Sequence, residues 1–199
     1  MRSVARGADR RLCDTCSRRG WLAPLALALL LGAVLPLRAE VLDRVLAVVG
    51  DDLITLTDVT AARDLGLAIV PPGTADPVRA VLTQLIDRAL ILAEVDRYAP
   101  PEPAADDVTT ALAIVRGRFP TDAAYQAALA RSGIDENHLR ETLRQSLRIR
   151  AYLNQRFVAS PADRTPGAAE DRQQALIDDW VAGLRRRASI VDLYVTERQ

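Results

Sequence analysis

Apolar residues recur along this chain at two different spacings. A strand-like spacing occurs at residues 41–55 and again near the C-terminus, and a helical spacing occurs between them. Residues 41–49 and 53–55 carry mainly aliphatic and β-branched side chains at a two-residue spacing, which favours strands. Gly50, Asp51 and Asp52 separate the two runs and have the composition of a tight turn. The pattern predicts a β-hairpin over 41–55.

The helical period of apolar residues runs through 57–157. We expect a first helix to begin at Thr57 and Asp58, whose side-chain oxygens accept hydrogen bonds from free N–H groups at a helix start. The strongest helix opens with a capping Asp76 and with Pro77 at its first position, and the proline-rich stretch 100–103 ends it. Its apolar residues recur at spacings of three and four and make it a central helix: Val78, Val81, Leu82, Leu85, Ile86, Ala89 and Leu92.

Two shorter helices follow the central one. Either Asp106 or Asp107 is expected to cap the first, which Gly117 ends. Thr121 begins the second, and Ser132-Gly133 stops it. The segment is therefore a chain of helices joined by brief turns.

A longer amphipathic helix starts at the capping residue Asp135. Its apolar residues fall within one arc of roughly 160°: Leu139, Leu143, Leu147, Ile149, Leu153 and Phe157. Arg150 lies inside this arc, where it either forms a buried ion pair or extends its stem to water. Neither alternative implies catalysis.

The C-terminal part reads as a linker over 159–169, then a helix, then a strand over 189–196. Trp180 and Leu184 lie on the apolar side of that helix. A lone strand leaves its backbone N–H and C=O groups unpaired, so we expect it to pair with the N-terminal hairpin. The predicted fold class is mostly α, with several helices and a small antiparallel sheet built from both ends of the domain.

Residues 1–39 have the composition of a secretory signal peptide: basic residues, an apolar run from Trp21 to Leu37, and a cleavage-like Leu37-Arg38-Ala39. The run is short for a membrane span, which needs about 20 residues; a retained N-terminal anchor is the alternative. The motif SRRGWL at 17–22 resembles a twin-arginine export signal, although an ordinary basic leader explains it as well. We expect membrane contact through this segment alone, before its cleavage.

The leader changes the charge balance of the chain. The 26 basic and 26 acidic residues cancel, but residues 1–39 hold seven Arg and two Asp, which leaves 19 basic against 24 acidic residues, a net charge of −5. This balance argues against a nucleic-acid partner. Cys13 and Cys16 also lie in the leader, so the predicted mature chain has no cysteine to form a disulfide.

Several motifs together resemble the N-terminal chaperone module of the periplasmic SurA family. They are DRVLAVVGDDLITLTDV, QLIDRALILAEVDRY, the pair of short helices, and LRETLRQSLRIRAYLNQRF, which together span residues 41–157. Residues 180–195 resemble the closing piece of that module. The resemblance implies one SurA N-terminal-like domain over 40–199, with a helical core at 57–157, the linker 159–169, and a closing helix and strand at 170–197.

The chain departs from that family where parvulin prolyl-isomerase domains usually stand, between the long helix and the closing helix. Only the linker occupies this position here, and the paired histidines of a parvulin site have no counterpart because His138 is the single histidine. The acidic pairs Asp51-Asp52 and Asp106-Asp107 fit local turns and caps better than a metal site. We therefore predict no catalytic residue, no metal and no cofactor; a residual isomerase is the alternative.

The resemblance implies a periplasmic holdase in a Gram-negative-type envelope, which binds unfolded or extended segments of exported or outer-membrane proteins without catalysis. An envelope assembly adaptor, or a module that dimerises through its small sheet, is the alternative. Apolar side chains on the shorter helices and near helix breaks are the predicted peptide-binding residues, although a place in the core explains them equally well: Tyr98, Ile114, Phe119, Tyr125 and Leu129.

Overall fold

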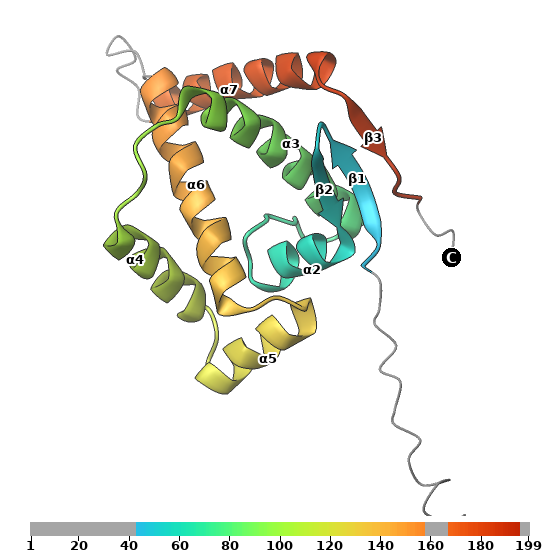
Figure 1. Cartoon of the computed structure of the whole chain (residues 1–199), viewed down its shortest axis with the longest axis vertical. Helices are drawn as coiled ribbons and strands as arrows, with labels where there is room; N and C mark the ends of the chain where they lie inside the picture. Colours follow the sequence, from blue (N-terminus) through green and yellow to red (C-terminus); the bar gives the residue numbers. More distant parts are fainter. Residues whose placement is uncertain (1–42, 158–166, 196–199) are drawn as a thin grey trace, which may run out of the picture. The chain divides into compact units, whose positions relative to one another are not determined.

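The computed structural model describes residues 43–157 and 167–195 (Figure 1). The predicted signal peptide over 1–39 and most of the predicted linker over 159–169 lie outside the described residues. Within the described part the chain is mostly helical with one small antiparallel sheet, which confirms the predicted fold class. None of its helices combines the length and the apolar character needed to cross a membrane.

The sheet joins residues from both ends of the described chain, as predicted. Strand β1 (Val45–Val49) lies between β2 (Asp52–Thr55) and β3 (Ile190–Asp192), and both pairings are antiparallel. Gly50 turns the hairpin with φ = 60°, and its N–H donates to the carbonyl of Ser189 at 3.0 Å. Strand β3 is shorter than the predicted strand over 189–196, because its paired positions end at Asp192.

Helix α2 (Leu56–Asp64) begins earlier than predicted. Its N-cap is Thr55, the last residue of β2, and not Thr57 or Asp58. The Thr55 side chain accepts from the Asp58 N–H at 3.3 Å, while the Asp58 carboxylate accepts from the Thr55 N–H at 2.8 Å. This reciprocal capping box uses Asp58 in the first turn of the helix, so the strand leads into the helix without a loop.

Helices α3 (Pro77–Tyr98), α5 (Asp122–Ser132) and α6 (Glu136–Arg156) begin after the predicted caps Asp76, Thr121 and Asp135. The cap predicted for α4 (Ala105–Arg116) is wrong: its N-cap is Ala104, which makes no side-chain cap. Asp106 and Asp107 instead lie in the first helical turn, where their negative charge complements the helix dipole.

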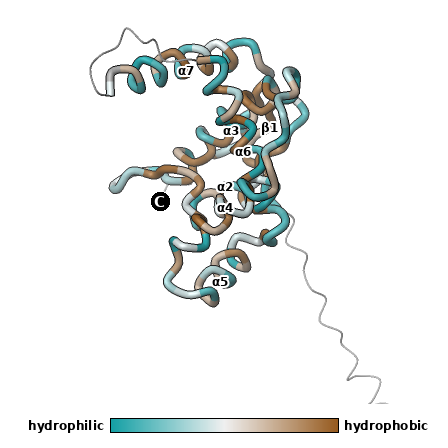
Figure 2. The backbone as a smooth tube through the Cα atoms, turned by 90° about the vertical axis from the view of Figure 1, so that its left-hand side faces the viewer, coloured by the Kyte–Doolittle hydropathy of each residue, from teal (hydrophilic) through white to brown (hydrophobic). Residues whose placement is uncertain are grey.

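The closing helix α7 (Ala168–Arg187) begins at the end of the segment predicted as the linker. Figures 1 and 2 show α7 at one end of the described domain and α5 at the other. Figure 2 also shows hydrophobic residues recurring along α3, the central helix predicted from the sequence. Of its predicted apolar residues, Val81, Leu82 and Ile86 are buried.

Two hydrophobic cores hold these elements together. The first core lies under the sheet and joins β1, β2, α2, α3, the C-terminal half of α6 and α7. Its buried members include Leu46, Ile54, Leu82, Tyr152 and Leu184. The second core joins α2, α4, α5 and the N-terminal half of α6. Its buried members are Ala61, Leu65, Leu112, Val115, Tyr125, Ala128, Leu129, Leu139 and Leu143.

A polar clamp fastens the end of β3 to the start of α3. Arg79 of α3 forms an ion pair with Asp192 and donates to the Tyr194 carbonyl at 3.0 Å. Its guanidinium also lies over the Tyr194 ring, 4.6 Å from the centroid, and the Tyr194 hydroxyl donates to Asp76. The C-terminal segment is thus held by side chains where its strand pairing has ended.

Replacing Leu82 by alanine should lower the free energy of unfolding by about 2–5 kcal/mol, because Leu82 is fully enclosed in the first core. The matched control is Leu176→Ala in α7, which removes the same atoms from a side chain that is 50% exposed, and should cost about 0.5 kcal/mol or less. Urea denaturation of both variants measures the difference. Equal costs would contradict the assigned core.

The clamp should make stability depend on pH. The Arg79 guanidinium holds the pKa of the Asp192 carboxyl below its usual range. A carboxyl whose pKa is lower when folded than when unfolded stabilises the fold above its usual pKa, and this contribution is lost as the pH falls through the folded value. Asp192→Asn should therefore be slightly less stable than wild type at neutral pH.

The difference between the two proteins should shrink to nothing under strongly acidic conditions. Urea denaturation across the acid range measures it, and Arg79→Gln, which removes the partner of Asp192, should flatten the profile in the same way. A gap that stays constant down to strong acid would contradict the ion pair.

Candidate functional site

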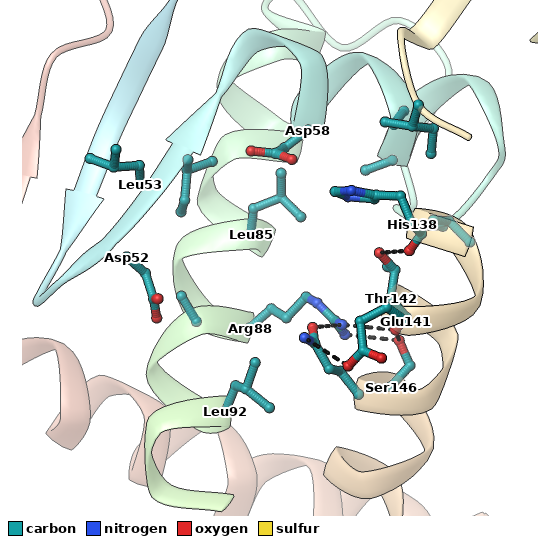
Figure 3. A pocket seen from close by; sticks show the side chains of 17 residues that line it. Asp52, Leu53, Asp58, Leu85, Arg88, Leu92, His138, Glu141, Thr142 and Ser146 are labelled. Atoms are coloured by element: carbon teal, nitrogen blue, oxygen red, sulfur yellow. Dashed lines mark hydrogen bonds between the residues drawn. The ribbon is translucent and has the colours of Figure 1, made fainter. Parts of the chain in front are cut away.

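A groove opens between the hairpin, α2, α3 and α6, with a cavity volume of about 330 Å³ (Figure 3). We call it the α3–α6 groove. Strand β2 forms one side of it, α3 forms its floor, and α6 forms the opposite wall. Its lining residues are Asp52, Leu53, Ile54, Asp58, Ala61, Ala62, Leu67, Leu85, Arg88, Ala89, Leu92, Ile134, His138, Glu141, Thr142, Gln145 and Ser146.

The groove exists because α6 changes partners along its length. Leu139 and Leu143 of α6 enter the second core, whereas Ile149 and Tyr152 pack in the first. The turn between these pairs carries Gln145 and Ser146, which line the groove instead of joining either core. Polar residues in the middle of α6 therefore separate the part of the helix that packs in one core from the part that packs in the other.

The floor and the hairpin side carry apolar residues alongside the charged Arg88 and Asp52. Leu85, Ala89 and Leu92 lie on successive turns of one face of α3, so the groove runs along a stripe of the helix. Leu53 of β2 is also among the lining residues and is 60% exposed. The groove thus offers open apolar surface along one side and hydroxyl and amide groups along the other.

Arg88 crosses the groove from α3 to α6 (Figure 3). It donates to the Ser146 hydroxyl at 2.8 Å, to the Thr142 carbonyl at 2.9 Å and to Oε1 of Gln145 at 3.1 Å. Burial lowers the pKa of this guanidinium, because desolvation disfavours the charged form. These acceptors are all neutral, so the cation is oriented by hydrogen bonds without being neutralised by them.

Two of the three carboxylates that line the groove, those of Asp58 and Glu141, are engaged with other groups. Asp58 belongs to the capping box of α2, and Glu141 forms an ion pair with Arg144. Among the described residues no carboxylate lies within ion-pair distance of Arg88. Arg88 is therefore a partly buried positive charge with hydrogen-bond partners but no counter-ion in the described chain.

His138 lies at the rim of the groove and is exposed. Its backbone N–H donates to the capping carboxylate of Asp135 at 2.7 Å, and its carbonyl accepts from Thr142. Within residues 43–157 and 167–195, no group of three or more His, Cys, Asp or Glu side chains is placed to hold a metal ion. What the groove offers chemically is binding by burial and hydrogen bonds.

The five residues predicted from the sequence to bind peptides do not line the α3–α6 groove. Tyr125 and Leu129 are buried in the second core, so in this structure their side chains are not available to a ligand. Phe119 is partly buried against Tyr125, with ring centroids 5.7 Å apart. Tyr98 and Ile114 are each 60% exposed, on α3 and α4.

Tyr98 belongs to an aromatic cluster near the end of α3. Its ring lies 5.6 Å from Tyr152, which lies 6.1 Å from Trp180, and Phe157 lies 5.5 Å from Trp180. The Arg156 guanidinium sits over three of these rings, those of Tyr152, Phe157 and Trp180. This cluster joins α3, α6 and α7 and extends the first core to the surface.

The sequence pattern singled out Arg150, whereas in the structure Arg88 is the arginine that connects α3 with α6. Arg150 lies on the apolar arc of α6 but is exposed. Of the two predicted alternatives, a buried ion pair and a stem that extends to water, the exposure agrees with the second. Arg88 is the arginine that bridges two helices, and the sequence does carry a signal for it. It lies between Leu85 and Leu92 on the apolar face of the central helix, where a charge is unexpected.

Comparison with known proteins confirms the resemblance seen in the sequence motifs. No family model matches the chain. Over 168 residues it is 31% identical to the chaperone SurA of Alkalilimnicola ehrlichii. The match covers 79% of this chain and 37% of that protein, so the chain spans well under half the length of this relative.

Arg88→Met should lower the free energy of unfolding by about 1–3 kcal/mol, because it removes three hydrogen bonds that a charged donor makes between α3 and α6. Arg150→Met is the matched control on an exposed arginine and should change stability by about 0.5 kcal/mol or less. Urea denaturation compares the two variants. A loss as large for Arg150 as for Arg88 would contradict the bridging role.

Proposed function

We propose, from the similarity to a SurA chaperone, that this chain binds unfolded or extended polypeptide segments in the α3–α6 groove and thereby keeps them from aggregating. The observation that carries the proposal is an open groove with an apolar floor and a wall of hydroxyl and amide groups. The leader composition supports a site of action in the periplasm, where exported and outer-membrane proteins would be the clients.

An extended polypeptide suits the two chemically different sides of this groove. Its apolar side chains lose contact with water against Leu53, Leu85 and Leu92, which is favourable by about 25 cal/mol for each Å² buried. Its backbone groups still need hydrogen-bond partners, and Gln145 and Thr142 on α6 offer side-chain donors and acceptors. Such binding requires no particular sequence, as a general chaperone demands.

The proposed binding involves no chemical step and no nucleotide. A client segment leaves when its own folding buries more apolar surface than the groove covers. The single histidine is exposed at the rim, where its backbone N–H donates to the helix cap Asp135, and the proposal gives its side chain no catalytic role. The proposal is therefore a non-catalytic holdase, with specificity set by the shape and polarity of the groove.

The test is the aggregation of an unfolded outer-membrane protein, followed by light scattering, in the presence of purified residues 40–199. Suppression is expected at a modest molar excess. Leu53→Ser should weaken it, because the substitution removes an apolar side chain from the groove without opening a buried core.

Ile114→Ser is the matched control, since Ile114 is also 60% exposed but lies on α4, outside the groove. It should leave the suppression unchanged. No suppression by the wild-type protein at stoichiometric excess would overturn the proposed function. A loss with Ile114→Ser but not with Leu53→Ser would move the binding surface from the α3–α6 groove to α4.

A further inference from the structure

The charge of Arg88 is unusual for a groove that is otherwise apolar on its floor. A charge in a partly desolvated place is costly unless an opposite charge compensates it, and the acceptors of Arg88 are a carbonyl, an amide and a hydroxyl. A guanidinium has more N–H groups than these three bonds use, and the remaining ones donate to no described residue. The structure therefore holds an oriented cation with donors to spare.

A carboxylate is the ligand that fits such a donor. The N–H groups that remain are on Nε and Nη1, since Nη2 already donates to Thr142 and Gln145, and a hydrogen bond from either one to a carboxylate joins charged partners and is stronger than a neutral one. Arg88 is also held by α6, so it needs little reordering when the ligand arrives. The site is thus prepared for an anion before any anion is bound.

The surroundings distinguish between the possible sources of a carboxylate. Asp52, Asp58 and Glu141 line the same groove, so a strongly acidic segment passing along it would be repelled. Leu85 and Leu92 flank Arg88, one turn before it and one turn after it on α3. A favourable ligand must therefore combine one negative charge with apolar surface a short distance away.

The last residue of a polypeptide has this combination, because its carboxylate and its side chain branch from the same Cα atom. We infer that Arg88 binds the free α-carboxylate of an extended client whose last residue is apolar, with the terminal side chain against Leu85, Ala89 and Leu92. This inference rests on the proposed function and adds to it a preference for chain ends. The preceding residues of the client run toward Leu53 of β2.

The test compares two peptides that end in leucine and differ only in the terminal group, a free acid in one and an amide in the other. Each carries an N-terminal fluorophore, and anisotropy measures its affinity for the full chain, expressed with its own leader and purified as the host processes it. The acid should bind at least about tenfold more tightly, as expected for a charged hydrogen bond. A third peptide, amidated and with an internal aspartate, should bind no better than the plain amide.

Variants separate recognition from a merely structural role. Arg88→Gln should reduce the ratio of acid to amide affinity to about one, Arg88→Lys should keep part of it because the charge remains, and Arg150→Gln should keep all of it. A structural role alone would change stability but not this ratio. Circular dichroism reports whether Arg88→Gln folds. If it does not, the ratio of acid to amide affinity in the wild-type protein and in Arg88→Lys still tests whether Arg88 recognises the carboxylate.

Equal binding of acid and amide by the wild-type protein would overturn the inference while leaving the holdase function intact. Tight binding of the internal-aspartate peptide would overturn the assignment to chain ends. If neither peptide binds, the inference fails, and the light-scattering assay with an unfolded outer-membrane protein then shows separately whether the holdase function fails as well.

Discussion

The membership of helix α6 in two hydrophobic cores is the constraint on which the rest of this structure depends. Its N-terminal half packs Leu139 and Leu143 with α4 and α5, while its C-terminal half packs Tyr152 under the sheet with α3 and α7. Merging the two cores would bury the polar middle of α6, at Gln145 and Ser146, without enough partners. Arg88 of α3 donates hydrogen bonds to these polar side chains of α6. They therefore keep partners without a merged core, and a groove remains beside them.

This arrangement explains how a small domain can present apolar surface without losing its own stability. The side chains that stabilise the fold, such as Leu82 and Tyr125, are buried away from the groove. Some groove-lining residues, such as Leu92, also pack against the first core but are only partly buried, and Leu53 is largely exposed. The proposed function needs such partly open apolar side chains, because fully buried core residues are not available to a client.

The sequence predicted most of the elements, but the peptide-binding residues that it predicted do not line the α3–α6 groove. The caps Asp76, Thr121 and Asp135 and the pairing of the C-terminal strand with the hairpin were predicted correctly. The predicted binding residues were chosen because they are apolar and lie near helix breaks, but short helices also need such residues for their own packing. Tyr125 and Leu129 serve that packing in the second core, whereas the groove is lined mainly from the long helices and the hairpin.

By itself the sequence determined the order of the helices and strands and most helix starts, because capping and hydrophobic period act between residues a few positions apart, but it misplaced the starts of α2 and α4 and the end of β3. It also carried the motifs that relate the chain to the SurA family. The tertiary structure alone decided which apolar residues became core and which stayed open, and which arginine bridges two helices. Arg88 and Arg150 both lie on apolar faces of their helices, yet Arg88 donates hydrogen bonds to a second helix, whereas Arg150 is exposed. Burial depends on elements distant in sequence, so no local pattern distinguishes the two.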